Sequence, residues 1–307
     1  MKKNNQHIQN QNSNIAASKR ELHTSVHGSP STVHGSRFTV HGSRFTVHGS
    51  RFTVHGSRST DHGSRSTVHG SLSTAHRPRL TVHVLFEDNH LIAINKRAGD
   101  IVQVDKTGDV SLEQTVKQYI KDKYNKPGEV FLGVAHRIDR PVSGAVLMAR
   151  TSKALERLNE MFQLKEVKKT YWAIVKNRPP KDEDTLTNYL VRNSQKNKTF
   201  AYDKEVKDSK LAILSYKLIA QSDTFFLLEI DLQTGRHHQI RAQLGHIGCP
   251  IRGDLKYGFN RTLDDGSIGL HSRRIQLVHP VTKQAIDIVA PVPEDKLWKW
   301  FEEKAVS

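Results

Sequence analysis

Cysteine is the residue that this sequence most conspicuously lacks. Cys249 is the single cysteine among 307 residues, which excludes an internal disulfide framework and a cysteine-rich zinc site and suits a reducing cytoplasm. No apolar run reaches the ~18 residues that a membrane-spanning helix needs. Residues 1–25 are polar and contain no signal-peptide core. We therefore expect a soluble, cytoplasmic protein without a membrane partner.

Acidic residues are also scarce relative to basic ones. The chain has 47 Lys and Arg against 31 Asp and Glu, a formal net charge of +16. Such an excess predicts an anionic partner, with nucleic acid first and a membrane surface second. Charge alone does not choose between these two.

Residues 1–80 differ in composition from the rest. A seven-residue unit repeats from Val26 to about Ala75, most regularly as Phe38-Thr-Val-His-Gly-Ser-Arg44. No helical apolar stripe runs through these units, so they do not predict a coiled coil. With many Gly, Ser and His and few large apolar groups, the segment predicts a disordered basic arm without an S4 domain. The arm either tethers RNA weakly or has no function, and its spaced histidines make a poor metal chelate.

The pattern becomes globular at residue 81 and indicates a catalytic domain over residues 81–307. Strands are expected at residues 81–87, 90–95, 145–149, 170–175, 211–221 and 225–232. One helix is expected after a capping box formed by Ser111 and Gln114, and another after Thr151 or Ser152. Strands and helices without regular βαβ alternation predict the α+β class, with a curved, largely antiparallel mixed sheet and peripheral helices.

One charged loop precedes the buried strand at residues 145–149. In His136-Arg-Ile-Asp-Arg140, one carboxylate lies among cationic and titratable neighbours. We expect a carboxylate at this position to bind neighbouring side chains rather than water. In isolation, Asp139 is better explained as a turn cap paired with the arginines.

A second stretch, Leu232-Gln-Thr-Gly-Arg-His-His-Gln-Ile-Arg241 and onward to Gly258, changes this interpretation. Together with His136-Arg-Ile-Asp139, Lys169-Thr-Tyr171 and Leu270-His-Ser-Arg273, it resembles the RluA-type pseudouridine synthases. The resemblance runs from about Val84 to about Trp300. It implies a central catalytic cleft and the isomerisation of specific uridines in rRNA or tRNA, without a cofactor or a metal.

The resemblance also implies roles for particular residues. Asp139 matches the catalytic aspartate, Tyr171 the tyrosine that stacks on the flipped uracil, and Arg241 the arginine that pairs with the aspartate. A buried ionised aspartate needs such a partner. Whether Asp139 attacks the sugar, attacks the base or abstracts a proton from C2′ stays open. The residues expected to bind RNA are Arg137, Arg140, Arg236, His238, Lys96, Lys169, Arg252 and Lys256.

Arg241 is expected on a helix that opens at Thr234-Gly235, with Arg236 and His238 at its head, where amide donors meet phosphate. Two rival hypotheses remain. A noncatalytic RNA-binding protein would share the charge, and a metal-dependent nuclease would use the histidines His136, His237, His238 and His246. The most economical hypothesis is a monomeric RNA pseudouridine synthase.

Overall fold

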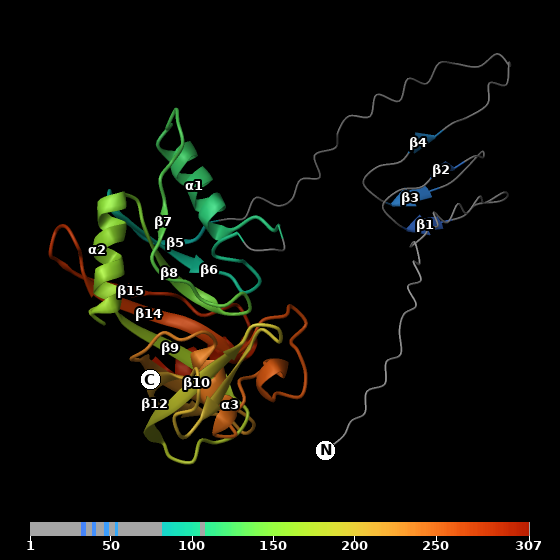
Figure 1. Ribbon diagram of the computed structural model, residues 1–307, viewed down its shortest axis with the longest axis vertical. Coiled ribbons are helices and arrows are strands. Elements are labelled where there is room, and N and C mark those ends of the chain that lie inside the picture. The colour runs from blue at the N-terminus through green and yellow to red at the C-terminus, as the bar shows by residue number, and fades with distance from the viewer. Residues whose placement is uncertain are drawn as a thin grey trace, which may run out of the picture. The chain divides into compact units, whose positions relative to one another are not determined.

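A computed structural model of the chain describes residues 82–104 and 108–306 and four short strands nearer the amino terminus (Figure 1). The chain divides into two units, Met1–Ala75 and His76–Ser307. The four strands pair in parallel, β1 with β3 and β2 with β4. They are β1 (Thr32–His34), β2 (Thr39–Val40), β3 (Thr46–His48) and β4 (Thr53–Val54). Apart from these strands, the predicted disordered arm at residues 1–80 lies outside the described residues.

An eleven-stranded sheet organises the second unit (Figure 1). Its main path runs β11-β10-β12-β13-β9-β14-β8-β6-β5, with β15 on β14 and β7 on β8. Within this sheet, β8 and β14 pair in parallel and the other neighbours are antiparallel. The strands are β5 (Val84–Glu87), β6 (Leu91–Lys96), β7 (Gly133–Val134), β8 (Ser143–Ala149), β9 (Lys168–Val175), β10 (Glu183–Asn193), β11 (Lys198–Tyr202), β12 (Lys210–Gln221), β13 (Phe226–Leu232), β14 (Leu270–Val278) and β15 (Ala285–Val289). The predicted α+β class is confirmed.

The two expected helices of the first half begin where their caps predict. Ser111 and Gln114 form the complete capping box of α1 (Leu112–Lys123), and the Thr151 side chain caps α2 (Ser152–Gln163). The alternation in β6 places Ile92 and Ile94 in the same core cluster as α1. Leu91 and Ala93 pack with α2 on the other face. These two helices therefore cover opposite faces of β6 and β8.

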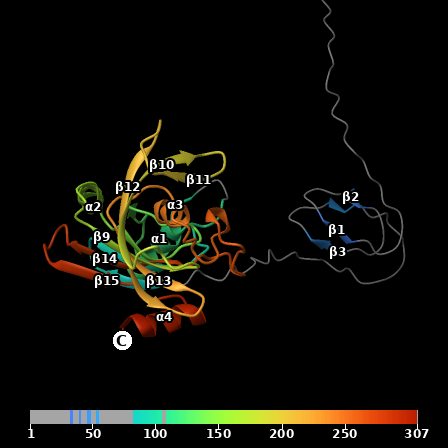
Figure 2. The same ribbon diagram turned by 90° about the horizontal axis from the view of Figure 1, so that it is seen from below.

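The second half of the sheet is also covered on both faces. Two helices do this, α3 (Gln239–His246) and α4 (Lys296–Val306). Tyr171 and Ala173 of β9 belong to the core cluster that includes α3, whereas Trp172 and Ile174 pack against α4. Figure 2 shows α4 below the sheet and α3 above it. A short 3-10 helix, η1 (Leu255–Tyr257), lies beside α3.

A row of backbone contacts across β8, β14 and β9 brings distant segments together. Ser272 on β14 is in register with both Gly144 on β8 and Tyr171 on β9. Gly144 has φ +112°, and a Cβ there would lie 2.3 Å from the Ser272 carbonyl oxygen. Only glycine allows this approach, because an added Cβ would overlap the backbone. The loop that carries Asp139 is thereby joined to the strand that carries Tyr171.

Within residues 82–104 and 108–306, no helix is both long enough and apolar enough to cross a membrane.

Candidate active site

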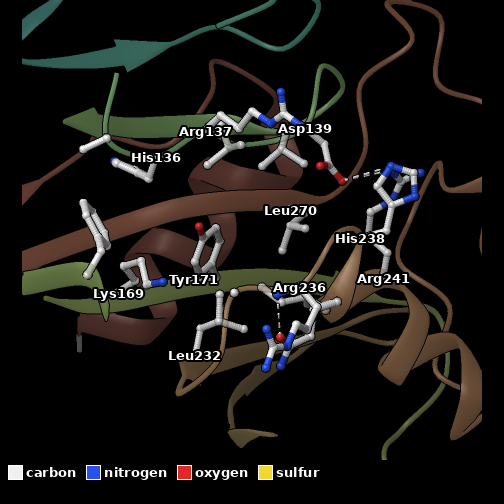
Figure 3. A pocket seen from close by; sticks show the side chains of 17 residues that line it. His136, Arg137, Asp139, Lys169, Tyr171, Leu232, Arg236, His238, Arg241 and Leu270 are labelled. Atoms are coloured by element: carbon white, nitrogen blue, oxygen red, sulfur yellow. Dashed lines mark hydrogen bonds and ion pairs between the residues drawn. The ribbon is translucent and has the colours of Figure 1, made fainter. Parts of the chain in front are cut away.

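A pocket of about 380 Å³ lies where the loop before β8, strand β9 and the start of α3 meet (Figure 3). The loop contributes Asp139, β9 contributes Tyr171, and α3 contributes Arg241. These three residues are far apart in the sequence and line one cavity. The structure therefore brings together the three residues expected to be catalytic.

Asp139 contacts its neighbours through one of its two carboxylate oxygens, Oδ2. Arg241 donates from Nη1 to Asp139 Oδ2 at 3.1 Å, and His238 Nε2 lies 3.5 Å from the same oxygen. The Asp139 side chain is 28% exposed, so it opens to the pocket more than the expectation of a buried carboxylate suggested. An ionised carboxylate can remain there because a cation and an N–H group face it.

Arg241 is itself held by a second carboxylate. Its Nε and Nη2 donate to Asp254 at 2.6 and 2.9 Å, and both side chains are almost fully buried. Burial opposes the charge on Arg241, but Asp254, and Asp139 to a lesser extent, raise the pKa of the guanidinium above its ordinary value. The arginine therefore remains cationic in an interior that would otherwise exclude a charge.

Tyr171 lines the pocket on the sheet side. Burial raises the pKa of its hydroxyl to about 12, and the negative charge of Asp139 acts in the same direction, while a hydrogen bond with Ser272 opposes it. The hydroxyl is therefore protonated at neutral pH. Its ring and hydroxyl both belong to the cavity surface (Figure 3).

His136 has a structural role in the loop. Its Nε2 accepts a hydrogen bond from the Leu147 amide at 2.9 Å, and its ring lies 5.0 Å from that of Phe162. Burial, with the charge of Lys169, lowers the pKa of His136 to about 3, so the ring is neutral. Because Nε2 is occupied by the amide, that nitrogen is unavailable as a metal ligand.

The helix that carries Arg241 begins later than predicted. We expected it to open at Thr234-Gly235, but α3 starts at Gln239. His238 adopts a left-handed backbone with φ +52°, which interrupts a helix at that point. The Gln239 side chain folds back and accepts from the Arg236 amide and the Thr234 hydroxyl, at 3.0 and 2.8 Å. Residues 234–238 therefore form a turn, and His238 lies before the helix rather than within its head.

Three of the expected RNA-binding cations line the pocket: Arg137, Lys169 and Arg236. A neighbouring groove shares Lys169 and Arg236 with the pocket and adds Lys165 and Lys168. Lys169 lies 5.6 Å from the centre of the Phe162 ring, and burial lowers the pKa of its ammonium. The pocket thus opens into a basic groove between α2 and the turn after β13.

Other expected RNA-binding residues lie elsewhere. The Lys96 ammonium is buried and donates to the carbonyls of Arg97, Asp100 and Arg140 at 2.8, 2.8 and 3.1 Å. Lys96 therefore supports the loop that carries Asp139, and the expectation that Lys96 lines an RNA path is wrong. The Arg140 side chain pairs with Asp109 at 2.9 Å outside the pocket.

Arg252 and Lys256 also lie outside the pocket lining. Arg252 makes two hydrogen bonds to Asp295, at 3.1 and 3.0 Å, in a second cavity. Lys256 donates to the Asn197 carbonyl at 2.9 Å and is close enough to Arg241 for its pKa to be lowered, after the effect of burial. Lys256 is therefore near the site, while Arg252 stabilises the carboxyl-terminal segment.

Sequence reasoning missed three residues of the site. Asp254 lies in the stretch from Leu232 to Gly258, but no neighbouring residue in the sequence indicated its contact with Arg241. The Tyr257 hydroxyl forms a hydrogen bond with His238 Nδ1 at 2.9 Å. Phe162 of α2, to which the sequence assigned no functional role, lines the pocket. All three depend on contacts between distant segments.

The described residues contain no group of three or more His, Cys, Asp or Glu side chains arranged to hold a metal ion. The chemistry that the pocket supports directly is that of an ionised carboxylate facing a tyrosine and several cations. Such a carboxylate can act as a nucleophile or stabilise positive charge on a bound group.

Comparisons with known proteins agree with this geometry. The model of the RNA pseudouridylate synthase family matches residues 90–246. Ribosomal large subunit pseudouridine synthase C of Rickettsia prowazekii is 33% identical over 216 residues, which cover 70% of this chain and 69% of the relative. The tRNA pseudouridine synthase C of Pectobacterium carotovorum is 29% identical over 230 residues, covering 68% of this chain and 58% of the relative.

Solved structures show the same fold. Human RNA pseudouridylate synthase domain containing 4 superimposes with a TM-score of 0.59 at 21% identity, covering 73% of this chain and 93% of that one. The architecture is thus that of the pseudouridylate synthases. The chain belongs to the RluA-type family of RNA pseudouridine synthases, and its activity is that of an isomerase.

Proposed function

We propose that this enzyme converts specific uridines of ribosomal or transfer RNA to pseudouridine, with Asp139 as the nucleophile after the base has flipped into the pocket. The observation that carries the proposal is the Asp139–Arg241 pair at 3.1 Å beside Tyr171 in one open cavity. The relatives named for ribosomal and transfer RNA support these two substrate classes equally.

The reaction rearranges one nucleotide without a change of oxidation state. The bond from C1′ to N1 of uracil breaks, and its electron pair leaves with the base. The base rotates, C5 bonds to C1′, the C5 proton is lost and N1 gains a proton. As nucleophile, Asp139 forms an ester bond to C1′ that is broken when C5 attacks. Attack on the base and proton abstraction from C2′ are the two other routes open to the same carboxylate.

Tyr171 supports the reaction in two ways. Its ring offers a flat surface on which a flipped uracil can stack. Its hydroxyl, which keeps its proton because its pKa is raised to about 12, can relay a proton at C5. Both roles require that the ring remain at the pocket surface, where β9 holds it.

The substrate strand is expected to follow the basic groove. Lys169 and Arg236 border both the pocket and the groove, and Arg137 lies on the loop beside Asp139. The negative charge of Asp231, which also borders the groove, acts on Lys169, and a phosphate bound in the groove would add a second counter-charge. By the family resemblance, Arg137 would fill the stack that the flipped base vacates, and its position in the pocket lining supports this role.

The test uses the full chain with RNA carrying tritium at uracil C5, in the presence of EDTA. The parent enzyme should release tritium to water, because the C5 proton is lost during isomerisation. Asp139→Asn should retain RNA binding and lose release, while Asp182→Asn on the exposed start of the β10 region should match the parent. An inactive parent that still binds RNA would instead establish an RNA-binding protein.

We propose further that the enzyme acts as a monomer in the cytoplasm. The single cysteine, Cys249, is buried, and burial raises the pKa of its thiol to about 11. A thiol of that kind is unreactive and is compatible with a reducing compartment.

A further inference from the structure

His238 is the most constrained side chain next to Asp139. Its backbone has φ +52°, a left-handed conformation that is strained for a residue with a Cβ. Its side chain is 6% exposed, and its ring stacks on that of His237 with centroids 3.8 Å apart. Strained backbones of this kind persist where the surrounding contacts define them closely. The orientation of this imidazole is therefore defined on several sides.

Tyr257 determines which nitrogen of His238 carries the proton. The Thr199 amide donates to the Tyr257 hydroxyl oxygen at 2.8 Å, and an amide can only donate. The hydroxyl proton of Tyr257 is thus available to His238 Nδ1, 2.9 Å away. When Nδ1 accepts, the single proton of a neutral imidazole resides on Nε2.

The ring is neutral under these conditions. Burial lowers the pKa of His238 to about 2, with the positive charge of Arg241 acting in the same direction. The 3.5 Å contact between His238 Nε2 and Asp139 Oδ2 is therefore not an ion pair, although both groups can ionise. The distance exceeds the about 2.7–3.2 Å of an N–H···O hydrogen bond, so in the free enzyme a neutral ring nitrogen lies beside the carboxylate oxygen without bonding to it. Contacts of this kind tighten when substrate is bound.

Arg241 and His238 contact the same oxygen. Both approach Asp139 Oδ2, and within the described residues Oδ1 has no polar partner. The two oxygens of one carboxylate are thereby made inequivalent. Tyr257 supports both contacts, because the Arg241 guanidinium also lies over its ring, 5.0 Å from the centroid.

Gly245 explains how Tyr257 reaches this position. A Cβ on Gly245 would lie 2.8 Å from the Tyr257 carbonyl oxygen, so α3 and η1 approach more closely than a larger residue would allow. The close approach places the Tyr257 hydroxyl against the His238 ring at the start of α3.

We propose that His238 and Tyr257 are positioning residues for Asp139. The Tyr257 O–H holds His238 as the Nε2–H tautomer, whose N–H faces Oδ2, closes to a hydrogen bond with it when the nucleotide binds, and leaves Oδ1 to face the reacting nucleotide. This inference rests on the proposed function. It also reassigns His238, which the sequence placed among phosphate-binding residues, because its ring faces a carboxylate and has no charge to offer an anion.

Tyr257→Phe tests the inference with the smallest change. The variant keeps the ring beneath Arg241 and removes the O–H that selects the tautomer. We expect kcat for tritium release from C5-labelled RNA to fall about 10-fold, with KM unchanged, because one hydrogen bond that orients the reacting group is lost. Tyr216→Phe is the matched control, since it removes another buried hydroxyl, bonded to the Lys181 carbonyl at 3.3 Å, and should preserve kcat.

Two substitutions of His238 separate positioning from phosphate binding. His238→Gln retains an N–H donor of similar reach and should keep most of kcat. His238→Leu retains volume without a donor and should lose about 100-fold in kcat at unchanged KM. Equal rates in the two variants, or a change confined to KM, would overturn the positioning role.

Nitrogen-15 NMR of the full chain provides a readout that does not depend on activity. Nε2 of His238 should carry the proton in the parent, and Tyr257→Phe should shift the ring toward a mixture of tautomers. An Nδ1–H ring in the parent would refute the inference. Because this measurement needs no substrate, an inactive parent would reject the proposed function while the tautomer still decides the inference.

Discussion

Asp254 binds Arg241 through two hydrogen bonds, from Nε at 2.6 Å and from Nη2 at 2.9 Å, and thereby fixes the plane of the guanidinium. Nη1 remains for Asp139, at 3.1 Å. A guanidinium held in this fork geometry cannot rotate freely, so Asp254 indirectly sets the position of Asp139. The catalytic loop and α3 are joined through this buried cation.

Substituting Asp254→Asn should destabilise the protein. The amide keeps the shape but removes the charge that balances buried Arg241, and breaking such a pair typically lowers the free energy of unfolding by about 3–5 kcal/mol. Urea denaturation measures this difference. Asp182→Asn, in an exposed pair with Arg178, is the control and should change stability little. Equal effects of the two substitutions would contradict the role of Asp254.

Lys96→Met should also lower the stability of the protein, although no carboxylate among the described residues forms an ion pair with this buried lysine. Methionine removes the ammonium donor from the partly buried carbonyls of Arg97 and Asp100, while the Arg140 carbonyl keeps the Gly99 amide; we expect the free energy of unfolding to fall by about 3 kcal/mol at pH 7. Lys299→Met on α4, whose lysine side chain is 40% exposed, is the matched control. A stable Lys96→Met protein would show that the carbonyls find other partners.

The same lysine predicts a pH dependence. Burial lowers the pKa of Lys96 to about 8 in the folded state, against 10.5 for an ordinary lysine. Between these two values the unfolded chain binds more protons at this residue, so its contribution to stability rises as pH increases from 8 to 10.5. The stability difference between the parent and Lys96→Met should therefore grow over this range in parallel urea titrations. A constant difference would contradict the lowered pKa.

Lys169 predicts a pH effect on substrate binding. Burial lowers the pKa of its ammonium, so in the free enzyme it loses its charge at a lower pH than an ordinary lysine does. A bound phosphate favours the charged form, and RNA affinity should therefore fall as pH rises through that range. KM should increase with pH in the parent and stay nearly constant in Lys169→Arg, whose guanidinium remains charged. The same rise in both proteins would assign the effect to another group.

Gly144→Ala should prevent proper pairing of β8 with β14. The new Cβ would lie 2.3 Å from the Ser272 carbonyl oxygen, at a residue with φ +112°. We expect a loss of more than about 2 kcal/mol in the free energy of unfolding, together with lost activity. Gly128→Ala is the control, since its Cβ would have no atom within 4 Å. Wild-type thermal stability of Gly144→Ala would show that the two strands can separate without harm.

Local patterns in the sequence predicted much of the fold. The capping box at Ser111, the cap at Thr151 and the two-sided alternation of β6 all depend on residues within a few positions of one another. The start of α3 was predicted too early because the left-handed backbone at His238 has no signal in residue type. Strands β10, β11, β14 and β15 were not predicted. Polar residues occupy some of the buried positions in β10, β11 and β14, among them Asn188, Thr199 and His271, which hides the apolar alternation.

The sequence by itself determined the family and the α+β class, and its motifs predicted that Asp139, Tyr171 and Arg241 lie in one site, because motifs and short-range periodicity are local properties of a sequence. Tertiary structure alone decided that Asp254 holds Arg241, that Tyr257 holds His238, and that Lys96 supports the catalytic loop rather than RNA. The physical reason is burial. Whether a charged or polar side chain binds solvent, substrate or a distant backbone group depends on which segments pack around it, and that packing is a property of the whole fold.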